Sequence, residues 1–237
     1  MTLLTVVQDA CDRLGIVRPT SVVGSSDQQI RQLLGLAQQE GLELSKRFPW
    51  QSLIKEKTWT ATATEEQTGI IPADFGHFIN GTFFNRTRHR FVEGPLDAVE
   101  WQRYKASTTT LIFDAFRVRG NSLLISPTPD SSYEYAFEYV STYWVATSSA
   151  STTPAQSTWL ADDDVGILPE ELMTLGLVWR FLRAKGLDYA EAFRTYEAQV
   201  MLREARDTAK RTVQMGRSFD YRRVRRPSWP DGSWNLS

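Results

Sequence analysis

The sequence has few of the side chains that bind metals or form covalent intermediates. Its 237 residues include one cysteine, Cys11, and two histidines, His77 and His89. One cysteine excludes an intrachain disulfide and a cysteine-based metal cluster, and two histidines leave little material for a zinc site. Cys11 lies among apolar residues in a helix-forming stretch, which is typical of a small buried side chain. We therefore expect no metal and no cofactor.

An excess of one charge and long apolar runs are also missing. The 27 lysines and arginines nearly balance the 28 aspartates and glutamates, for a formal net charge of −1. This balance argues against a protein whose whole surface binds nucleic acid or an anionic membrane. No apolar run approaches the roughly 20 residues of a membrane span, and the first residues lack the pattern of a secretion signal. We expect a soluble protein, made in a reducing cytoplasm, with no membrane partner.

The sequence motifs of common enzymes are absent as well. No GxGxxG, P-loop, GxSxG or HExxH motif occurs, and a serine–histidine–aspartate triad could use only His77 or His89. His77 lies between aromatic residues in Phe75-Gly76-His77-Phe78 and is interpreted as a core or interface histidine. His89 lies in the basic stretch 86–90 and is interpreted as the solvated tip of a hairpin.

Three consecutive carboxylates, Asp162–Asp164, form the most concentrated acidic stretch. Such residues could bind a divalent cation or act in general acid–base chemistry. Consecutive side chains do not converge on one point without a special loop, and no spaced fourth ligand follows. The stretch is therefore interpreted as a solvated loop that leads into a helix.

Helical periodicity marks the amino-terminal end of the chain. Apolar residues recur at helical spacing over residues 2–14, and Gly15 supplies a carboxyl-terminal stop. Ser26-Asp27-Gln28-Gln29 has the form of a capping box with Ser26 as the N-cap. The helix that it opens ends at Phe48-Pro49, because proline disfavours the helical region for the residue before it.

The same periodicity returns near the other end. Leu168-Pro169-Glu170-Glu171 predicts a helix start, and Lys185-Gly186 predicts its end. The apolar face expected for this helix consists of Leu172, Leu175, Val178, Trp179 and Leu182. A last helix is expected over residues 188–215. Its apolar side should carry Phe193, Tyr196 and Val200, and its polar side the pairs Arg203–Asp207 and Asp207–Arg211.

Between these regions the helical period is lost and β-forming residues dominate. The longest expected strand is Tyr133–Val145, where aromatic and polar residues alternate. Gly120-Asn121 predicts a two-residue hairpin turn. The strands flanking this turn, two further strands and one short helix are expected at residues 111–119, 122–126, 58–62, 81–84 and 97–105. Residues 146–158 are rich in serine, threonine and alanine and predict a long exposed connection.

This order predicts an α+β protein in which helices from both ends of the chain form one bundle around a β-rich insert. Neither terminal helix pair has enough apolar surface to be stable alone, but together they make a four-helix core. The expected parts are amino-terminal helices (1–49), a β-rich insert (50–158), carboxyl-terminal helices (159–216) and an extended docking tail (217–237).

The tail combines arginine with aromatic side chains. It contains five arginines and two aspartates, so its side-chain charge is +3, and its prolines forbid a regular helix. Tryptophan, tyrosine and arginine are enriched at binding hot spots. The candidate docking residues are Arg217, Phe219, Tyr221, Arg222, Arg223, Arg225, Arg226, Trp229 and Trp234. Two other interpretations stay open: the tail could fold back on its own bundle, or it could bind nucleic acid.

Two of the eight tryptophans, Trp229 and Trp234, thus lie where no core is predicted. The other six are expected in the core or in contacts between subunits. They are Trp50, Trp59, Trp101, Trp144, Trp159 and Trp179.

Several short motifs follow one another in a fixed order between Leu3 and about Arg211. They are Phe48-Pro49-Trp50, Ile71-Pro72-Ala73-Asp74-Phe75, Ile79-Asn80-Gly81-Thr82-Phe83, Leu168-Pro169-Glu170-Glu171-Leu172, Leu175-Gly176-Leu177 and Lys185-Gly186-Leu187-Asp188-Tyr189. In order and spacing these motifs resemble the head-to-tail connector, or adaptor, proteins of tailed bacteriophages. None of the motifs is catalytic, so the resemblance concerns architecture.

The resemblance implies a structural, non-enzymatic virion protein at the head–tail interface, synthesised in the host cytoplasm. It implies a homo-oligomeric ring, usually a dodecamer, mounted under the portal protein and bridging to tail proteins of the nozzle or tail tube. In that family the carboxyl-terminal segment commonly reaches into the portal, which fits the tail described above. DNA would pass through the lumen without specific binding, so that the ring serves genome packaging and ejection.

Two alternatives from other functional classes remain. A virion-associated cell-wall hydrolase would need a carboxylate pair, for which Glu65, Glu66 and Asp162–Asp164 are the clustered candidates. A nucleic-acid-binding module would use the basic aromatic tail, and its DNA affinity would depend steeply on salt.

Overall fold

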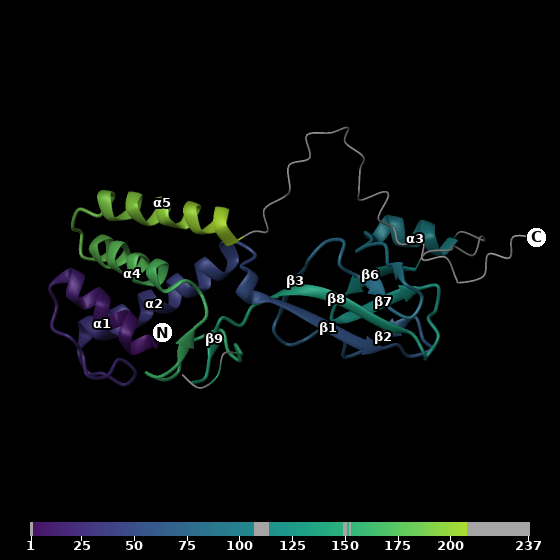
Figure 1. Cartoon of the computed structure of the whole chain (residues 1–237), viewed down its shortest axis with the longest axis horizontal. Helices are drawn as coiled ribbons and strands as arrows, with labels where there is room; N and C mark the ends of the chain where they lie inside the picture. Colours follow the sequence, from purple (N-terminus) through teal and green to yellow (C-terminus); the bar gives the residue numbers. More distant parts are fainter. Residues whose placement is uncertain (1, 107–113, 149–150, 152, 208–237) are drawn as a thin grey trace, which may run out of the picture. The chain divides into compact units, whose positions relative to one another are not determined.

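The computed structural model describes residues 2–106, 114–148, 151 and 153–207 (Figure 1). It combines α-helices with antiparallel sheets, which confirms the α+β class. The described chain divides into two compact units. The helical unit contains the described residues up to 54 and from 140 onward, and the β unit contains those from 55 to 139.

The first two helices begin at side-chain caps. Helix α1 (Leu3–Leu14) starts after Thr2, whose hydroxyl accepts a hydrogen bond from the Thr5 N–H, and ends at Gly15 with φ of 68°. Both ends confirm the prediction. Helix α2 (Gln28–Arg47) starts after Asp27 and not after Ser26. The predicted cap is wrong because the Asp27 carboxylate accepts from the Gln29 N–H at 2.7 Å, so the capping side chain lies one residue later.

Helix α4 (Glu170–Ala184) lies against α1, α2 and α5 (Ala190–Asp207). Having three neighbours widens its buried surface beyond the face predicted from spacing. Leu175, Val178 and Leu182 are only half-buried, which corrects the prediction. The buried side chains of α4 are Leu172, Met173, Thr174, Leu177, Trp179, Arg180 and Phe181. The part of the last helix predicted beyond residue 207 lies outside the described residues.

A buried ion pair joins three of these helices. The carboxylate of Glu40 on α2 is fully buried and accepts from Arg180 Nε of α4 at 2.5 Å and from the Tyr196 hydroxyl of α5 at 2.6 Å. The Arg180 guanidinium also donates to Glu43 Oε2 at 2.7 Å. Burial raises the pKa of Glu40, although the hydrogen bonds from Tyr196 and Arg180 oppose this rise.

Close packing leaves no room for side chains beside this pair. A Cβ atom on Gly176 of α4 would overlap the Glu40 carboxylate, and one on Gly41 would overlap the indole of Trp144. Both glycines lie inside helices, where glycine costs about 0.5–1 kcal/mol relative to alanine. Glycine lowers the helix propensity at these two positions, and it leaves the space that the Glu40 carboxylate and the Trp144 indole occupy.

A second set of contacts ties the end of α2 to α5. Arg47 donates to Glu197 at 2.7 Å and to Glu204 at 3.1 Å, and Asp207 accepts from the Gln51 N–H at 2.7 Å. Arg203 pairs with Glu171 of α4 at 3.4 Å. The predicted Arg203–Asp207 pair within one helix is therefore wrong, because both side chains have partners on other segments.

The predicted long connection is exposed at Thr147, Thr153, Ala155 and Thr158, but part of it is paired and Ala146 and Pro154 are buried. Val145 and Gln156 exchange backbone hydrogen bonds of 3.0 and 3.1 Å, so the segment returns on itself. Strand β9 (Val145–Ala146) then pairs with β10 (Val165–Gly166). Trp144 is fully buried and packs edge-on against Trp159, with ring centroids 5.1 Å apart.

The β unit contains two antiparallel sheets. In the first, the strand order is β1 (Ile54–Thr60), β8 (Glu134–Ser141), β4 (Phe84–Asn85) and β5 (Arg90–Phe91), and β3 (Phe75–Phe78) also pairs with β8. In the second, the order is β2 (Glu66–Gln67), β7 (Ser122–Ser126) and β6 (Ala115–Arg119). The short helices η1 (Gln51–Leu53) and α3 (Ala98–Ala106) complete the described elements, and α3 confirms the predicted short helix.

The predicted hairpin forms, and two of the predicted strands are shorter than expected. Arg119 pairs with Ser122 across the turn, which confirms the hairpin; residues 111–113 of its first strand lie outside the described residues. The predicted strand 133–145 ends at Ser141, because the Ser141 hydroxyl accepts from the Tyr143 N–H and the chain turns there. The strand predicted at 81–84 shrinks to Phe84–Asn85, since Gly81 adopts a turn with φ of 80°.

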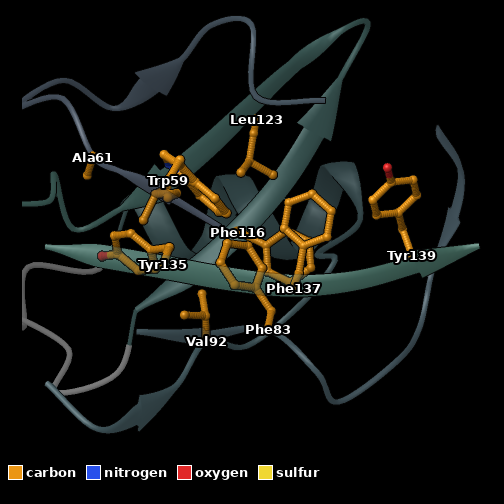
Figure 2. Close-up of a cluster of buried hydrophobic side chains, with 10 residues drawn as sticks. Trp59, Ala61, Phe83, Val92, Phe116, Leu123, Tyr135, Phe137 and Tyr139 are labelled. Carbon is orange, nitrogen blue, oxygen red and sulfur yellow. The ribbon is translucent and has the colours of Figure 1, made fainter. Parts of the chain in front are cut away.

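Aromatic side chains fill the core of the β unit (Figure 2). Trp59 stacks on Tyr135 at 5.6 Å between ring centroids, and Phe83 lies 4.4 Å from Phe116. The Tyr135 hydroxyl donates to buried Asp114 at 2.9 Å, so the phenol does not lose a hydrogen bond on burial. All six tryptophans expected in a core or a subunit contact are buried, with at most 9% of their surface exposed.

The two glycines Gly176 and Gly35 provide a matched test of the helix packing. Gly35 is exposed on α2 and a Cβ there meets no atom within 4 Å, so we expect Gly35→Ala to raise the free energy of unfolding by about 0.5–1 kcal/mol. Gly176→Ala should lower it by about 1–3 kcal/mol, because the new methyl group displaces the Glu40 carboxylate. Urea unfolding of both variants measures the difference. Equal effects of the two substitutions would contradict the close packing described here.

Candidate interaction surfaces

The nine residues expected to dock on a partner lie outside the described residues. They are Arg217, Phe219, Tyr221, Arg222, Arg223, Arg225, Arg226, Trp229 and Trp234. Their role stays a prediction. The candidate surfaces that can be built from contacts therefore come from the rest of the chain.

The side chains considered for nucleophilic or metal chemistry are one buried cysteine and two exposed histidines. Cys11 is fully buried, as predicted, and burial raises the pKa of its thiol, which keeps it protonated near neutral pH. His89 is exposed in the turn between β4 and β5, which confirms a solvated hairpin tip. His77 is also exposed, so its assignment to a core is wrong. The flanking Phe75 and Phe78 rings pack against each other at 4.6 Å and leave His77 on the solvent side.

The interpretation of Asp162–Asp164 as a solvated loop is wrong for two of the three residues. Asp162 accepts from the Ser21 hydroxyl at 2.6 Å and from the Val22 and Val23 N–H groups at 3.0 and 2.7 Å. Burial alone would raise the pKa of Asp162, but these hydrogen bonds outweigh it and lower the pKa below its usual value. Asp162 thus fastens the loop after α1.

Asp164 has the same function in its own loop. Its buried carboxylate accepts from the Leu160 and Ala161 N–H groups at 2.7 and 2.9 Å and from Gln156 Nε2 at 2.7 Å. Asp163, between the two, remains exposed. The carboxylates of Asp162 and Asp164 therefore each accept three hydrogen bonds from N–H or O–H donors. Within the described ranges, no group of three or more histidine, cysteine or acidic side chains could hold a metal ion.

The acidic residues suggested for a hydrolase do not form one cluster. Glu65 pairs with Lys105 of α3, and Glu66 lies exposed on β2. Asp162 and Asp164 belong to the helical unit and are occupied by the donors just described. Aspartate is a common acceptor for loop N–H groups, and this general property was the available signal for their structural role.

Exposed apolar side chains gather along α5 and the turn before it. We call this set the α5 surface: Leu187, Tyr189, Phe193, Met201 and Leu202. Leu187 and Met201 are 54% and 61% exposed. Two of the five pack against Trp179, whose ring lies 5.1 Å from the Phe193 ring and 6.5 Å from the Tyr189 ring; the Arg180 guanidinium lies 4.5 Å from the Trp179 ring. Exposed apolar patches of this kind mark sites of protein association.

A second surface lies on the side of β1, β8, β4 and β5 that faces away from the aromatic core. We call it the outer sheet face: Glu56, Phe84, Arg86, Phe91, Glu134, Ala136 and Glu138. Phe84 and Phe91 are cross-strand partners with ring centroids 5.8 Å apart. Part of this face is hollowed, with a volume of about 630 Å³.

Acidic side chains outnumber arginines on the outer sheet face. Arg86 pairs with Glu56 and, at 3.4 Å, with Glu134. The Glu138 carboxylate lines the hollow and has no hydrogen-bond or ion-pair partner among the residues that the structure describes. Glu56, Glu134 and Glu138 thus outnumber Arg86 beside an exposed phenylalanine pair, and His89 lines the same hollow. The face is acidic and partly apolar.

The chain was compared with models of known protein families. The model of the SU10 adaptor protein family matches residues 1–227. The match covers both units and extends into the segment that contains most of the predicted docking residues. No curated protein matches the chain. Among the described helices, none is long and apolar enough to cross a membrane.

Asp162 gives a prediction with a defined pH dependence. Asp162→Asn should lower the free energy of unfolding at pH 7 by about 1–2 kcal/mol, because a charged acceptor of three hydrogen bonds is lost. The pKa of Asp162 is lower in the folded protein than in the unfolded chain. Its contribution is therefore complete above the ordinary aspartate pKa of about 4 and is lost as the pH falls through the folded value.

The difference between wild type and Asp162→Asn should accordingly narrow below about pH 4 in urea titrations. Asp163→Asn is the matched control, since Asp163 is exposed, and we expect it to change stability by less than about 0.5 kcal/mol at any pH. A deficit in Asp162→Asn that stays constant from pH 7 to pH 3 would show that its charge is not involved.

Proposed function

Because the chain belongs to the SU10 adaptor protein family, we propose that it is a structural virion protein that joins the DNA-filled head of a tailed phage to its tail. The observation that carries this proposal is the family match over residues 1–227, which spans nearly the whole chain. In this role the protein forms a homo-oligomeric ring, a dodecamer, below the portal protein. The nozzle or tail-tube proteins bind on the opposite side of the ring.

We assign the ring to the helical unit, as a four-helix bundle of α1, α2, α4 and α5. A head-to-tail ring joins two different patches of each copy and closes without a free end. The α5 surface supports this assignment, because α5 and the turn before it expose five large apolar side chains to solvent. Its aromatic members lie on Trp179, so a neighbouring copy would extend an existing aromatic cluster.

The β unit faces the tail proteins, and residues 217–237 dock on the portal. The arginines and tryptophans of this segment are the residue types that dominate the energy of protein interfaces. Many identical segments engaging one portal would gain by avidity. DNA passes through the lumen without specific binding, and the near-zero net charge of the chain supports such a path.

Removing the tail tests the portal assignment. A chain that ends at Gly216 should still fold, because the described helices and strands of both units lie before that residue. It should lose co-sedimentation with the portal protein of the same phage. Retained portal binding would refute the docking role.

A matched pair of tail variants separates aromatic contacts from charge. The double substitution of Trp229 and Trp234 by phenylalanine should retain most of the portal affinity, whereas substitution of both by alanine should weaken it at least tenfold, about 1.4 kcal/mol. A strong, salt-dependent DNA affinity that the truncation abolishes would instead favour the nucleic-acid module.

The α5 surface predicts a defect in ring formation. Met201→Glu places a charge among the exposed apolar side chains, and we expect it to shift the mass distribution in mass photometry from rings to smaller species. Thr195→Glu is the control, because it adds the same charge at an exposed polar position of α5. Rings of full size from Met201→Glu would place the subunit contact elsewhere.

A further inference from the structure

The outer sheet face has the chemistry of a binding surface for a basic, aromatic segment. The Phe84–Phe91 pair lies on β4 and the edge strand β5, and the neighbouring strand β8 carries Glu138, whose carboxylate has no partner among the described residues. Two further carboxylates, Glu56 and Glu134, share a single guanidinium, that of Arg86. A ligand for this hollow needs positive charge for the carboxylates and flat apolar groups for the exposed rings.

One segment of this chain has that composition. Residues 217–234 carry five arginines against two aspartates, together with four aromatic residues, Phe219, Tyr221, Trp229 and Trp234. We propose that in the unassembled subunit the outer sheet face binds the chain's own residues 217–234. The arginines would pair with Glu138 and its neighbours, and an aromatic side chain would pack on the Phe84–Phe91 pair.

The charge of the face argues against two other occupants. A nucleic acid would bring phosphates towards three carboxylates and one guanidinium, which is repulsive. The same face of a second copy carries the same excess of carboxylates, so pairing of two such faces is opposed as well. A segment of net positive charge is attracted, and Glu138 becomes paired on binding.

This contact would order the steps of assembly, and in that respect it goes beyond the proposed function. A segment held on the β unit is not available to the portal, and a covered outer sheet face is not available to a tail protein. Portal binding would release the segment and expose the face at the same time. The two binding equilibria are then linked, because each site competes for the same residues.

Engineered cysteines test the contact in the full chain. Thr58 is exposed on β1, next to Glu56 in the strand that borders the face, and Ser228 precedes Trp229. In a chain with Thr58→Cys and Ser228→Cys, mild oxidation of the dilute protein should give an intrachain disulfide, measured by peptide mapping without reduction. Native Cys11 does not compete, because it is fully buried.

The control moves the first cysteine to α3. Arg103 is exposed there and is not part of the outer sheet face, so Arg103→Cys with Ser228→Cys should form at least about fivefold less disulfide. Equal yields at the two positions would overturn the proposal. A disulfide that forms only between chains, with a yield that rises with protein concentration, would overturn the intrachain assignment.

Charge substitutions test what holds the segment. Glu138→Lys should reduce the Thr58→Cys cross-link about fivefold, and Glu138→Gln should reduce it less. Glu66→Lys is the control, because Glu66 is also exposed and lies on β2 in the other sheet, and its substitution changes the net charge by the same amount. Unchanged cross-linking in Glu138→Lys, with an unaltered circular dichroism spectrum, would also overturn the proposal.

The outcome can be separated from that of the proposed function. The cross-link is measured without the portal protein, so a portal that does not bind leaves this test intact. Conversely, if the cross-link does not form, portal docking of residues 217–237 is still tested by the chain that ends at Gly216. If both hold, added portal protein should suppress the cross-link in proportion to the segment bound.

Discussion

The buried carboxylate of Glu40 constrains the helical unit more than any other single group. A carboxylate taken out of water is costly unless its oxygens are hydrogen-bonded, and here each oxygen has one donor, Arg180 from α4 and Tyr196 from α5. A slip of α2 by one turn would separate all three groups. Removing one partner of such a pair costs about 3–5 kcal/mol. The interaction therefore specifies how α2 lies against the carboxyl-terminal helices, and it makes the two ends of the chain depend on each other.

Local patterns predicted the elements well and their long-range partners poorly. The end of α1 at Gly15, the hairpin at Gly120-Asn121 and the start of α4 follow from rules that involve a few neighbouring residues. The partner of Glu40, in contrast, is 140 residues away in the chain. The donors to Asp162 are equally distant, so Asp162–Asp164 reads in sequence as an ordinary polar loop. No local rule shows that such a carboxylate will be saturated by a remote loop.

The same limit applies to the candidate surfaces. Phe84, Glu138 and Phe91 lie on three strands, and only the register of β4 with β5 and β8 places them on one face. The α5 surface was partly visible in the sequence, since the spacing assigned Phe193 to an apolar side. Phe193 lies at the edge of that side and remains 38% exposed, because the helix buries only Tyr196 and Val200. The composition of residues 217–234 is evident from sequence alone, but what they bind is not.

Among the described residues, the chain passes from one unit to the other twice, at Ile54 and near Val140, and the two passages are the start of β1 and the end of β8. These strands are neighbours in the same sheet. Two covalent connections that enter a sheet side by side share any tension applied between the units. A protease that cut only one connection would leave the units tethered, so this protein should resist mechanical separation better than one with a single linker.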